Sequence, residues 1–269
     1  MDPLAPLITA LHSEGRLRVW SMIITVFGDL VQHRGGEIST ARLGRLLGRV
    51  GVEQGALRTA LSRLGRDGWV HSERSGRTSL YRLSAKGLNQ FAPATTRIYA
   101  APRATPVAQW AIALQLGPSG KPEARLSPAD EVIGVTDCLV SGTLDQVSDA
   151  YRAAILNPAH RAALVGMAAD LQAMVAPLPT ALDAAAARML LVHRWRRLVL
   201  RFPDIPADLM PQDTPLRDPR RAVADIYARL VPAAEAWLEA ESLGLPAMPP
   251  AITNAANRFT ETHPSLYRG

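Results

Sequence analysis

Residues 50–83 read VGVEQGALRTALSRLGRDGWVHSERSGRTSLYRL and predict a short helix followed by two short strands. At about 100° per residue, the helix places Leu57, Ala60, Leu61 and Leu64 on one side, which we expect to be buried. The opposite side carries small, hydroxylated and arginine side chains, where a merely solvated helix more often carries Glu and Lys. This combination predicts a helix that lies in the major groove of DNA, followed by a β-hairpin wing.

The candidate DNA-binding residues fall into two groups. Small side chains at the centre of the outer face let the helix sit deep in the groove, and arginines reach guanine edges or phosphates. The turn between the two strands carries two further arginines that can reach phosphates. The sequence therefore predicts contacts to double-stranded DNA from Gly55, Arg58, Thr59, Ser62, Arg63 and Arg66 in the helix and from Arg74 and Arg77 in the wing.

The positive charge of the chain is concentrated in the same region. Residues 1–100 contain 14 Arg and Lys against 7 Asp and Glu, a net charge of +7, whereas the remaining residues have 16 against 17, a net charge of −1. Such an asymmetry is typical of a nucleic-acid-binding module attached to a neutral body. All the basic residues except Lys86 and Lys121 are arginines, which favour bidentate contact with phosphate and guanine.

Length and composition predict a globular protein of two or three domains, because 269 residues of which 48% are hydrophobic can bury sizeable cores. No apolar run approaches the ~20 residues of a membrane-spanning helix, and the first residues do not resemble a secretory signal. A single cysteine fits a reducing compartment, so we expect a cytoplasmic protein with no membrane partner. That cysteine, Cys138, lies in the apolar stretch 132–140 and is predicted to be a buried strand residue.

The residues on either side of the recognition helix predict the other elements of a winged helix-turn-helix domain over residues 21–95. The expected elements are a helix over residues 21–32, a strand over 37–39, a second helix over 40–47, and a closing helix after Ser84. Ser39 or Thr40 would cap the second helix. Apolar residues at helical spacing within residues 4–11 predict an N-terminal arm, residues 1–20, that packs on a neighbour.

Two separated segments resemble one protein family. The first holds Phe27-Gly28-Asp29, Arg58, Arg63-Leu64, Gly68-Trp69, and the run Arg74, Gly76-Arg77, Tyr81, Leu83-Ser84 and Gly87. The second runs from LLVHRWRRL at residues 190–198 to Asp204-Ile205-Pro206 and Leu209-Met210-Pro211, with Ile205 where the family usually has leucine. Together they are similar to the phenylacetic-acid catabolism repressors, the PaaX-like family. The resemblance implies a winged helix-turn-helix regulator with a ferredoxin-like middle domain and a helical domain that binds an aryl-CoA thioester and then releases DNA.

The middle region, residues 96–176, matches the family less well. Strands are expected over residues 109–116 and 131–139, but residues 117–130 contain three prolines and two glycines. Proline inside a helix costs about 3 kcal/mol, so a loop is predicted in place of the family's helix. The first strand offers no carboxylate that could hold a catalytic metal ion. We interpret the region as an abbreviated ferredoxin-like element that is either structural or forms a homodimer.

The remaining residues, 177–269, predict a helical regulatory domain. Helices are expected over residues 159–175, 180–202, 217–242 and 249–261, separated by prolines. The basic run on the second of these helices is the candidate site for the acyl-CoA effector, because its phosphates need positive charge. By helical spacing, Arg194, Arg197 and Arg201 share a face, whereas Arg196 points elsewhere. His193 is a further candidate contact, and Trp195 or Trp237 would meet the apolar end of the ligand. The alternative is a solvated, ion-paired helix face with both tryptophans in the core.

The sequence carries no catalytic or metal-binding motif. Its six histidines include no H-x3-H pair, and it has no phosphate-binding glycine loop and no G-x-S-x-G turn. We therefore predict an α+β, mainly helical protein with an N-terminal winged helix-turn-helix, a small abbreviated ferredoxin-like middle domain and a C-terminal helical domain. Its predicted function is that of a homodimeric transcriptional repressor of aromatic-acid catabolism without catalytic groups or cofactors. The alternatives are a winged-helix regulator with an unrelated effector or none, and a hydrolase or nuclease built on the middle domain.

Overall fold

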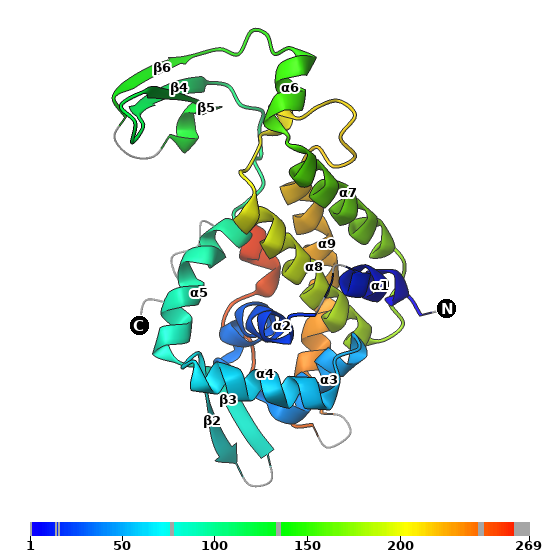
Figure 1. Cartoon of the computed structure of the whole chain (residues 1–269). Helices are drawn as coiled ribbons and strands as arrows, with labels where there is room; N and C mark the ends of the chain where they lie inside the picture. The colour runs from blue at the N-terminus through cyan, green and yellow to red at the C-terminus, as the bar shows by residue number, and fades with distance from the viewer. Residues whose placement is uncertain are drawn as a thin grey trace.

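The computed structural model describes residues 2–13, 15, 17–75, 78–132, 136–241 and 245–260. The chain is mixed α and β, with helices that run through the body and a small sheet at each end (Figure 1). The N-terminal elements are α1 (Ala5–Ser13), α2 (Val19–Val26), β1 (Glu37–Ser39), α3 (Thr40–Arg49), α4 (Gln54–Arg66), β2 (Val70–Ser75), β3 (Thr78–Leu83) and α5 (Ala85–Ile98).

The helices and strands around α4 follow the order that the sequence predicts. Strands β1, β3 and β2 form an antiparallel sheet in that order, and the β2–β3 hairpin projects from the end of α4 (Figure 1). The Ser39 hydroxyl accepts a hydrogen bond from the Arg42 backbone N–H at 3.1 Å and caps α3. Ser84 caps α5 in the same way through Gly87. Local capping signals therefore located both helix starts correctly.

The first helix of this region changes its geometry before it ends. After Val26 it continues as a π-helical turn, η1 (Phe27–Val31), and a short 3-10 turn, η2 (Gln32–Arg34), before Gly35 takes a positive φ of 82°. A Cβ on Gly28 would lie 1.9 Å from the ring of Phe91 on α5, so only glycine fits at this position. The wide π turn places Asp29 in the protein interior, which becomes important below.

The junction between α4 and the hairpin explains several residues of the family resemblance. Gly68 has a φ of +74°, and its carbonyl accepts a hydrogen bond from the Ser84 hydroxyl at 2.6 Å. A Cβ on Gly87 would lie 2.4 Å from the carbonyl oxygen of Trp69. The Trp69 side chain is half-buried and packs on the edge of the core. Its truncation would therefore remove less buried area than a core substitution does.

The middle region is a three-stranded antiparallel sheet, and three predictions about it are wrong. The strands are β4 (Trp110–Leu116), β5 (Pro122–Pro128) and β6 (Cys138–Gly142), in the order β5-β4-β6. The predicted loop at residues 117–130 contains β5, and the second strand begins at residue 138 instead of 131. Cys138 is exposed, not buried. The described residues form one sheet here with helix α6 (Asp149–Ile155) after it, in place of a complete ferredoxin-like domain.

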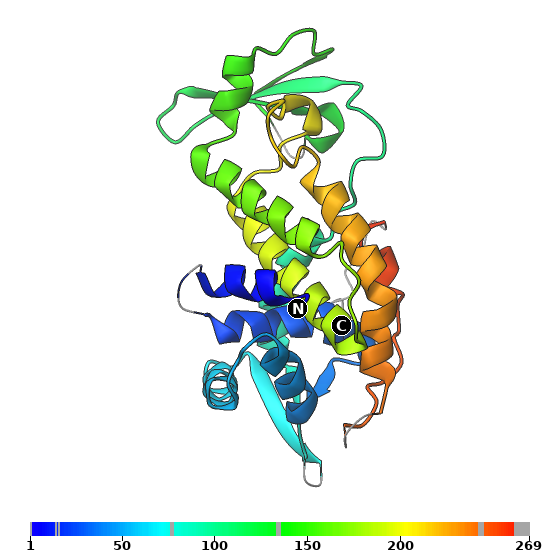
Figure 2. The same ribbon diagram turned by 90° about the vertical axis from the view of Figure 1, so that its right-hand side faces the viewer.

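Long antiparallel helices make up the C-terminal layer, as predicted. They are α7 (Pro158–Ala173), α8 (Ala181–Arg201) and α9 (Pro219–Glu239), and the expected fourth helix is a short 3-10 segment, η5 (Ala255–Phe259). Helix α8 contacts α2, α3 and α5, so the N-terminal elements and this layer share one continuous core (Figure 2). Helix α1 packs on α7 of the same chain with its leucines buried, so the predicted arm covers its own protein.

Candidate nucleic-acid interface

Helix α4 presents the predicted outer face to solvent. Leu57, Leu61 and Leu64 are buried at 1–3% exposure and hold the helix against the core. The helical period then forces the remaining side chains outward. The exposed residues of this helix include all six that were predicted to contact DNA, namely Gly55, Arg58, Thr59, Ser62, Arg63 and Arg66. Of these, Arg63 lies 3.6 Å from Asp67, an exposed ion pair that stabilises the fold by less than about 1 kcal/mol.

One of the two predicted wing arginines lies on the β2–β3 hairpin, which follows α4 in the chain. Its strands pair in register from Val70 with Leu83 to Ser75 with Thr78. Arg74 is exposed near the end of β2. Arg77, the other predicted contact, lies outside the described residues. Helix α4 and the hairpin therefore both present predicted DNA-contacting arginines to solvent.

A buried carboxylate joins the turn after α2 to the helical body of the protein, and the sequence alone did not indicate it. Asp29, in the π turn after α2, is 1% exposed. Its Oδ1 accepts hydrogen bonds from the hydroxyls of Tyr99 at 2.7 Å and Tyr227 at 2.8 Å, and its Oδ2 accepts one from Arg188 Nε at 2.8 Å. Burial alone would raise the pKa of Asp29, but the charges of Arg188 and Arg258 outweigh it and lower the pKa.

A second carboxylate extends the same network. Glu235 on α9 accepts hydrogen bonds from His33 Nε2 at 3.1 Å and from Arg34 Nε at 2.8 Å, and it pairs with Arg188. These contacts lower the pKa of Glu235 against the effect of burial. Because Arg188 bridges the two carboxylates, a single ionic network joins the η1 and η2 turns to α8 and α9. Buried charges in such a network are costly to expose or unpair.

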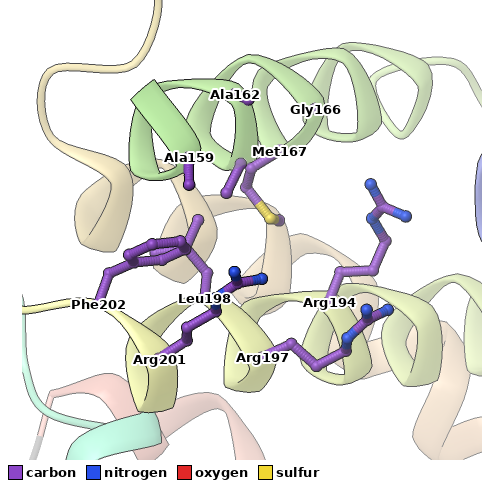
Figure 3. A pocket seen from close by; sticks show the side chains of 10 residues that line it. Ala159, Ala162, Gly166, Met167, Arg194, Arg197, Leu198, Arg201 and Phe202 are labelled. Carbon is purple, nitrogen blue, oxygen red and sulfur yellow. The ribbon is translucent and has the colours of Figure 1, made fainter. Parts of the chain in front are cut away.

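Helix α8 carries the candidate effector residues. A cavity lies between part of α8 and part of α7. The cavity has a volume of about 410 Å³ and is lined by Arg194, Arg197, Arg201, Phe202 and small residues of α7. Figure 3 shows the three arginines along one face of α8, as their spacing predicts. Arg194 pairs with the buried Asp170, and the Arg201 guanidinium lies 5.1 Å from the ring centroid of Phe202. Arg197 and Arg201 are exposed.

Arg196 and the two candidate tryptophans make contacts within the protein. Arg196 turns away from the cavity and donates hydrogen bonds to the Ser21 carbonyl at 3.3 Å and the Thr25 hydroxyl at 3.0 Å. The tryptophans predicted to meet the ligand are core residues: Trp195 is fully buried and donates to the Ile98 carbonyl at 2.8 Å, and Trp237 is 6% exposed. The prediction that they contact a ligand is wrong, since neither lines a described cavity on α8.

His193 is buried beside Arg196, and its position leads to a prediction about pH. Its Nδ1 lies 3.1 Å from the Thr25 hydroxyl oxygen. Burial, together with the charges of Arg196, Arg197 and Arg194, lowers the pKa of His193 to about 3, so the folded protein keeps it neutral. The unfolded chain binds this proton near the ordinary pKa of ~6.5.

We therefore expect the free energy of unfolding to fall as the pH drops below about 6.5, by about 2 kcal/mol at pH 5 from His193 alone. The pKa values of the buried His33 and His160 are also lowered, which adds to the loss in the same direction. Urea unfolding of the protein and of His193→Gln at pH 7 and pH 5 measures this contribution. An equal pH dependence for both proteins would contradict the assignment.

The described residues offer no site for metal chemistry. No group of three or more His, Cys, Asp or Glu side chains comes together among them in an arrangement that could hold a metal ion. None of the described helices is long and apolar enough to cross a membrane. The groups that stand out by their chemistry are the arginines of α4, the hairpin and α8.

An exposed arginine-bearing helix and hairpin lie on a helical body that contains a buried ionic network and a basic cavity. Together these features are typical of a DNA-binding regulatory protein. The family model of the PaaX-like proteins matches residues 18–87, and the model of the PaaX-like C-terminal domain matches residues 144–240. The chain belongs to the PaaX-like family. The transcriptional repressor PaaX of Escherichia coli (strain K12) is 29% identical to it, over 81% of this chain and 82% of the relative.

Proposed function

We propose that this protein is a DNA-binding transcriptional repressor that acts in the cytoplasm and controls aromatic-acid catabolism. Helices α3 and α4 with the β2–β3 hairpin would form a winged helix-turn-helix, with α4 in the major groove. The observation that supports it best is the outer face of α4, where Gly55, Thr59, Ser62 and Arg66 are all exposed. The similar E. coli protein, named a transcriptional repressor, supports the same function.

Selection of duplexes from a random DNA pool by the full-length protein tests this function. We expect the protein to enrich one sequence and to bind it with an affinity that falls steeply as salt rises. An affinity that is equal for the enriched sequence and for unrelated DNA would contradict the proposal. The enriched duplex is also the probe for the experiments below.

The repressor is proposed to act as a homodimer that forms through the middle sheet. Alternate residues of the three strands point to one face, and every residue on that face is apolar. They are Trp110, Ile112, Leu114 and Leu116 on β4, Pro122, Ala124, Leu126 and Pro128 on β5, and Cys138, Val140 and Gly142 on β6. Ile112, Leu116 and Val140 are 44%, 64% and 57% exposed. An uncharged face of this kind is self-complementary, and a second copy would cover it.

Two adjacent residues of β6 provide a matched test of the dimer. Val140 and Leu139 are 57% and 50% exposed but lie on opposite faces of the sheet. In sedimentation measurements at micromolar concentration, we expect Val140→Glu to be a monomer, because it places a charge in the interface. Leu139→Glu should remain a dimer, as should the unaltered protein. A monomeric unaltered protein, or a dimeric Val140→Glu variant, would contradict the proposal.

The effector is proposed to bind in the cavity between α7 and α8. Its volume of about 410 Å³ lies within the ~300–1,000 Å³ of ordinary ligand pockets. Arg197 and Arg201 are exposed at its rim and could hold phosphates, while Met167, Leu198 and Phe202 supply apolar contacts. This arrangement favours a ligand with an apolar end and several negative charges, which an aryl-CoA thioester has.

Calorimetric titration of the full-length protein with phenylacetyl-CoA, other aryl-CoA thioesters and the free acids tests the effector. We expect heat from a thioester and none from the acids, and a several-fold weaker affinity in Arg201→Ala. Arg161→Ala is the matched control, because Arg161 is on α7, outside the cavity, and pairs with Asp213. Heat from none of the thioesters would exclude the coenzyme and leave a regulator with an unrelated effector or none.

A further inference from the structure

A second basic hollow lies between α4 and α8. It has a volume of about 1150 Å³ and extends from Thr59 and Arg63 on α4, past Arg18 at the start of α2, to Arg197 and Arg201 on α8. Among the described residues that line it, five are arginines and none is acidic. Arg18, Arg63, Arg197 and Arg201 are exposed, so their guanidinium groups can meet an anion from solvent.

The position of this hollow beside α4 indicates what the anion is. Thr59 belongs both to the hollow and to the outer face of α4. A helix with its side chains is ~10–12 Å across, and the major groove is ~12 Å wide, so a helix in the groove has a phosphate strand on either side. In Figure 1, α4 lies between the β2–β3 hairpin and α8. The hairpin would meet one strand, and the hollow would meet the other.

We propose that the hollow between α4 and α8 binds the phosphate backbone of DNA, with Arg18, Arg197 and Arg201 contacting phosphates of the strand opposite the wing. This inference rests on the proposed DNA-binding function and extends the interface from the N-terminal elements to the C-terminal layer. Such contacts position the protein and add affinity but carry no information about base sequence.

The same two arginines of α8 also line the cavity between α7 and α8. Arg197 and Arg201 would therefore serve DNA on one side of α8 and an anionic ligand on the other. One guanidinium cannot contact both at its full strength, so occupancy of the cavity would weaken DNA binding through these two side chains. This arrangement would link a ligand to release from DNA without any movement of α4.

Salt dependence of DNA binding tests the proposal in the full-length protein. For Arg197→Gln/Arg201→Gln we expect the slope of log affinity against log salt to fall by about 0.9 per lost phosphate contact, with base preference unchanged. Arg125→Gln is the matched control, because it removes one charge from the exposed surface of β5 at the far end of the molecule. Arg197→Lys/Arg201→Lys keeps both charges and should keep the slope.

A second measurement locates the contact on the DNA. We would prepare a set of duplexes, each with one phosphate replaced by a neutral methylphosphonate. The unaltered protein should bind a duplex more weakly only when the replaced phosphate is one that it contacts. At the phosphates that face the hollow, the same replacement should reduce the DNA affinity of the double glutamine variant by a several-fold smaller factor. If the protein selects DNA but the double variant keeps the full slope and the full methylphosphonate effect, the hollow does not bind DNA, although the repressor function stands. If no DNA is selected, the function itself fails.

Discussion

Replacing Asp29 by alanine should lower the free energy of unfolding by about 3–5 kcal/mol, because it leaves buried positive charges without their partner. Arg188 is fully buried, and Arg258 is 3% exposed. Both lie against the Asp29 carboxylate, together with the hydroxyls of Tyr99 and Tyr227. Loss of the carboxylate would remove an anion from beside both buried guanidinium groups, of which Arg188 would keep Glu235. Equilibrium unfolding by urea, with the midpoint and the slope both fitted, measures the effect.

Asp130→Ala is the matched control for this prediction. Asp130 also accepts two hydrogen bonds from one arginine, Arg103, but its side chain is 66% exposed. Water replaces the lost partner there, so we expect a much smaller loss of stability than for Asp29→Ala. A similar small loss for both variants would show that the Asp29 network contributes little to stability.

Local signals in the sequence located the elements that form the proposed DNA interface. The apolar period of Leu57, Leu61 and Leu64 set the outer face of α4, and Ser39 and Ser84 marked two helix starts. These features depend on neighbours within a few residues, so no tertiary information is needed to find them. The relative angles of Arg194, Arg196 and Arg197 on α8 could be predicted for the same reason.

Strand β5 was missed because its prolines indicate a loop when they are considered without the sheet. In the structure Pro122 and Pro128 are the first and last residues of β5, which is an edge strand. Proline is tolerated at such positions because its missing N–H is not needed by a neighbouring strand. The position of a strand within its sheet depends on distant pairing, which a single sequence does not reveal. Cys138 was misplaced for a related reason, since its apolar surroundings form an exposed sheet face.

The buried ionic network could not be predicted from local patterns. Asp29 and Arg188 are 159 residues apart, and each lies in a segment where a charged residue is ordinarily expected to be exposed. The resemblance to a family did include Phe27-Gly28-Asp29, but a motif shows neither the π turn nor the partners that bury it. Only the packing of α8 and α9 on the N-terminal helices brings these groups together.

Replacing Arg66 by alanine should reduce affinity for the selected duplex by about 1–3 kcal/mol if the side chain reads a guanine. Arg66 is exposed at the C-terminal end of α4, on the face that carries Thr59 and Ser62. A bidentate contact to guanine O6 and N7 distinguishes that base from the others, so its loss should also relax the preference at one position of the site. Competition binding against duplexes with each base at each position measures both effects.

Arg74→Ala provides the comparison that separates base contacts from phosphate contacts. Arg74 lies on β2 of the hairpin, which in the proposed complex would meet the DNA backbone. Its replacement should weaken binding to all duplexes alike and lower the salt slope by about 0.9, with every base preference kept. If Arg66→Ala behaved in this way too, Arg66 would be a phosphate contact, and the base contacts of α4 would have to come from its other exposed residues. If Arg74→Ala changed a base preference and kept the salt slope, the hairpin would not have the phosphate-binding role of a wing.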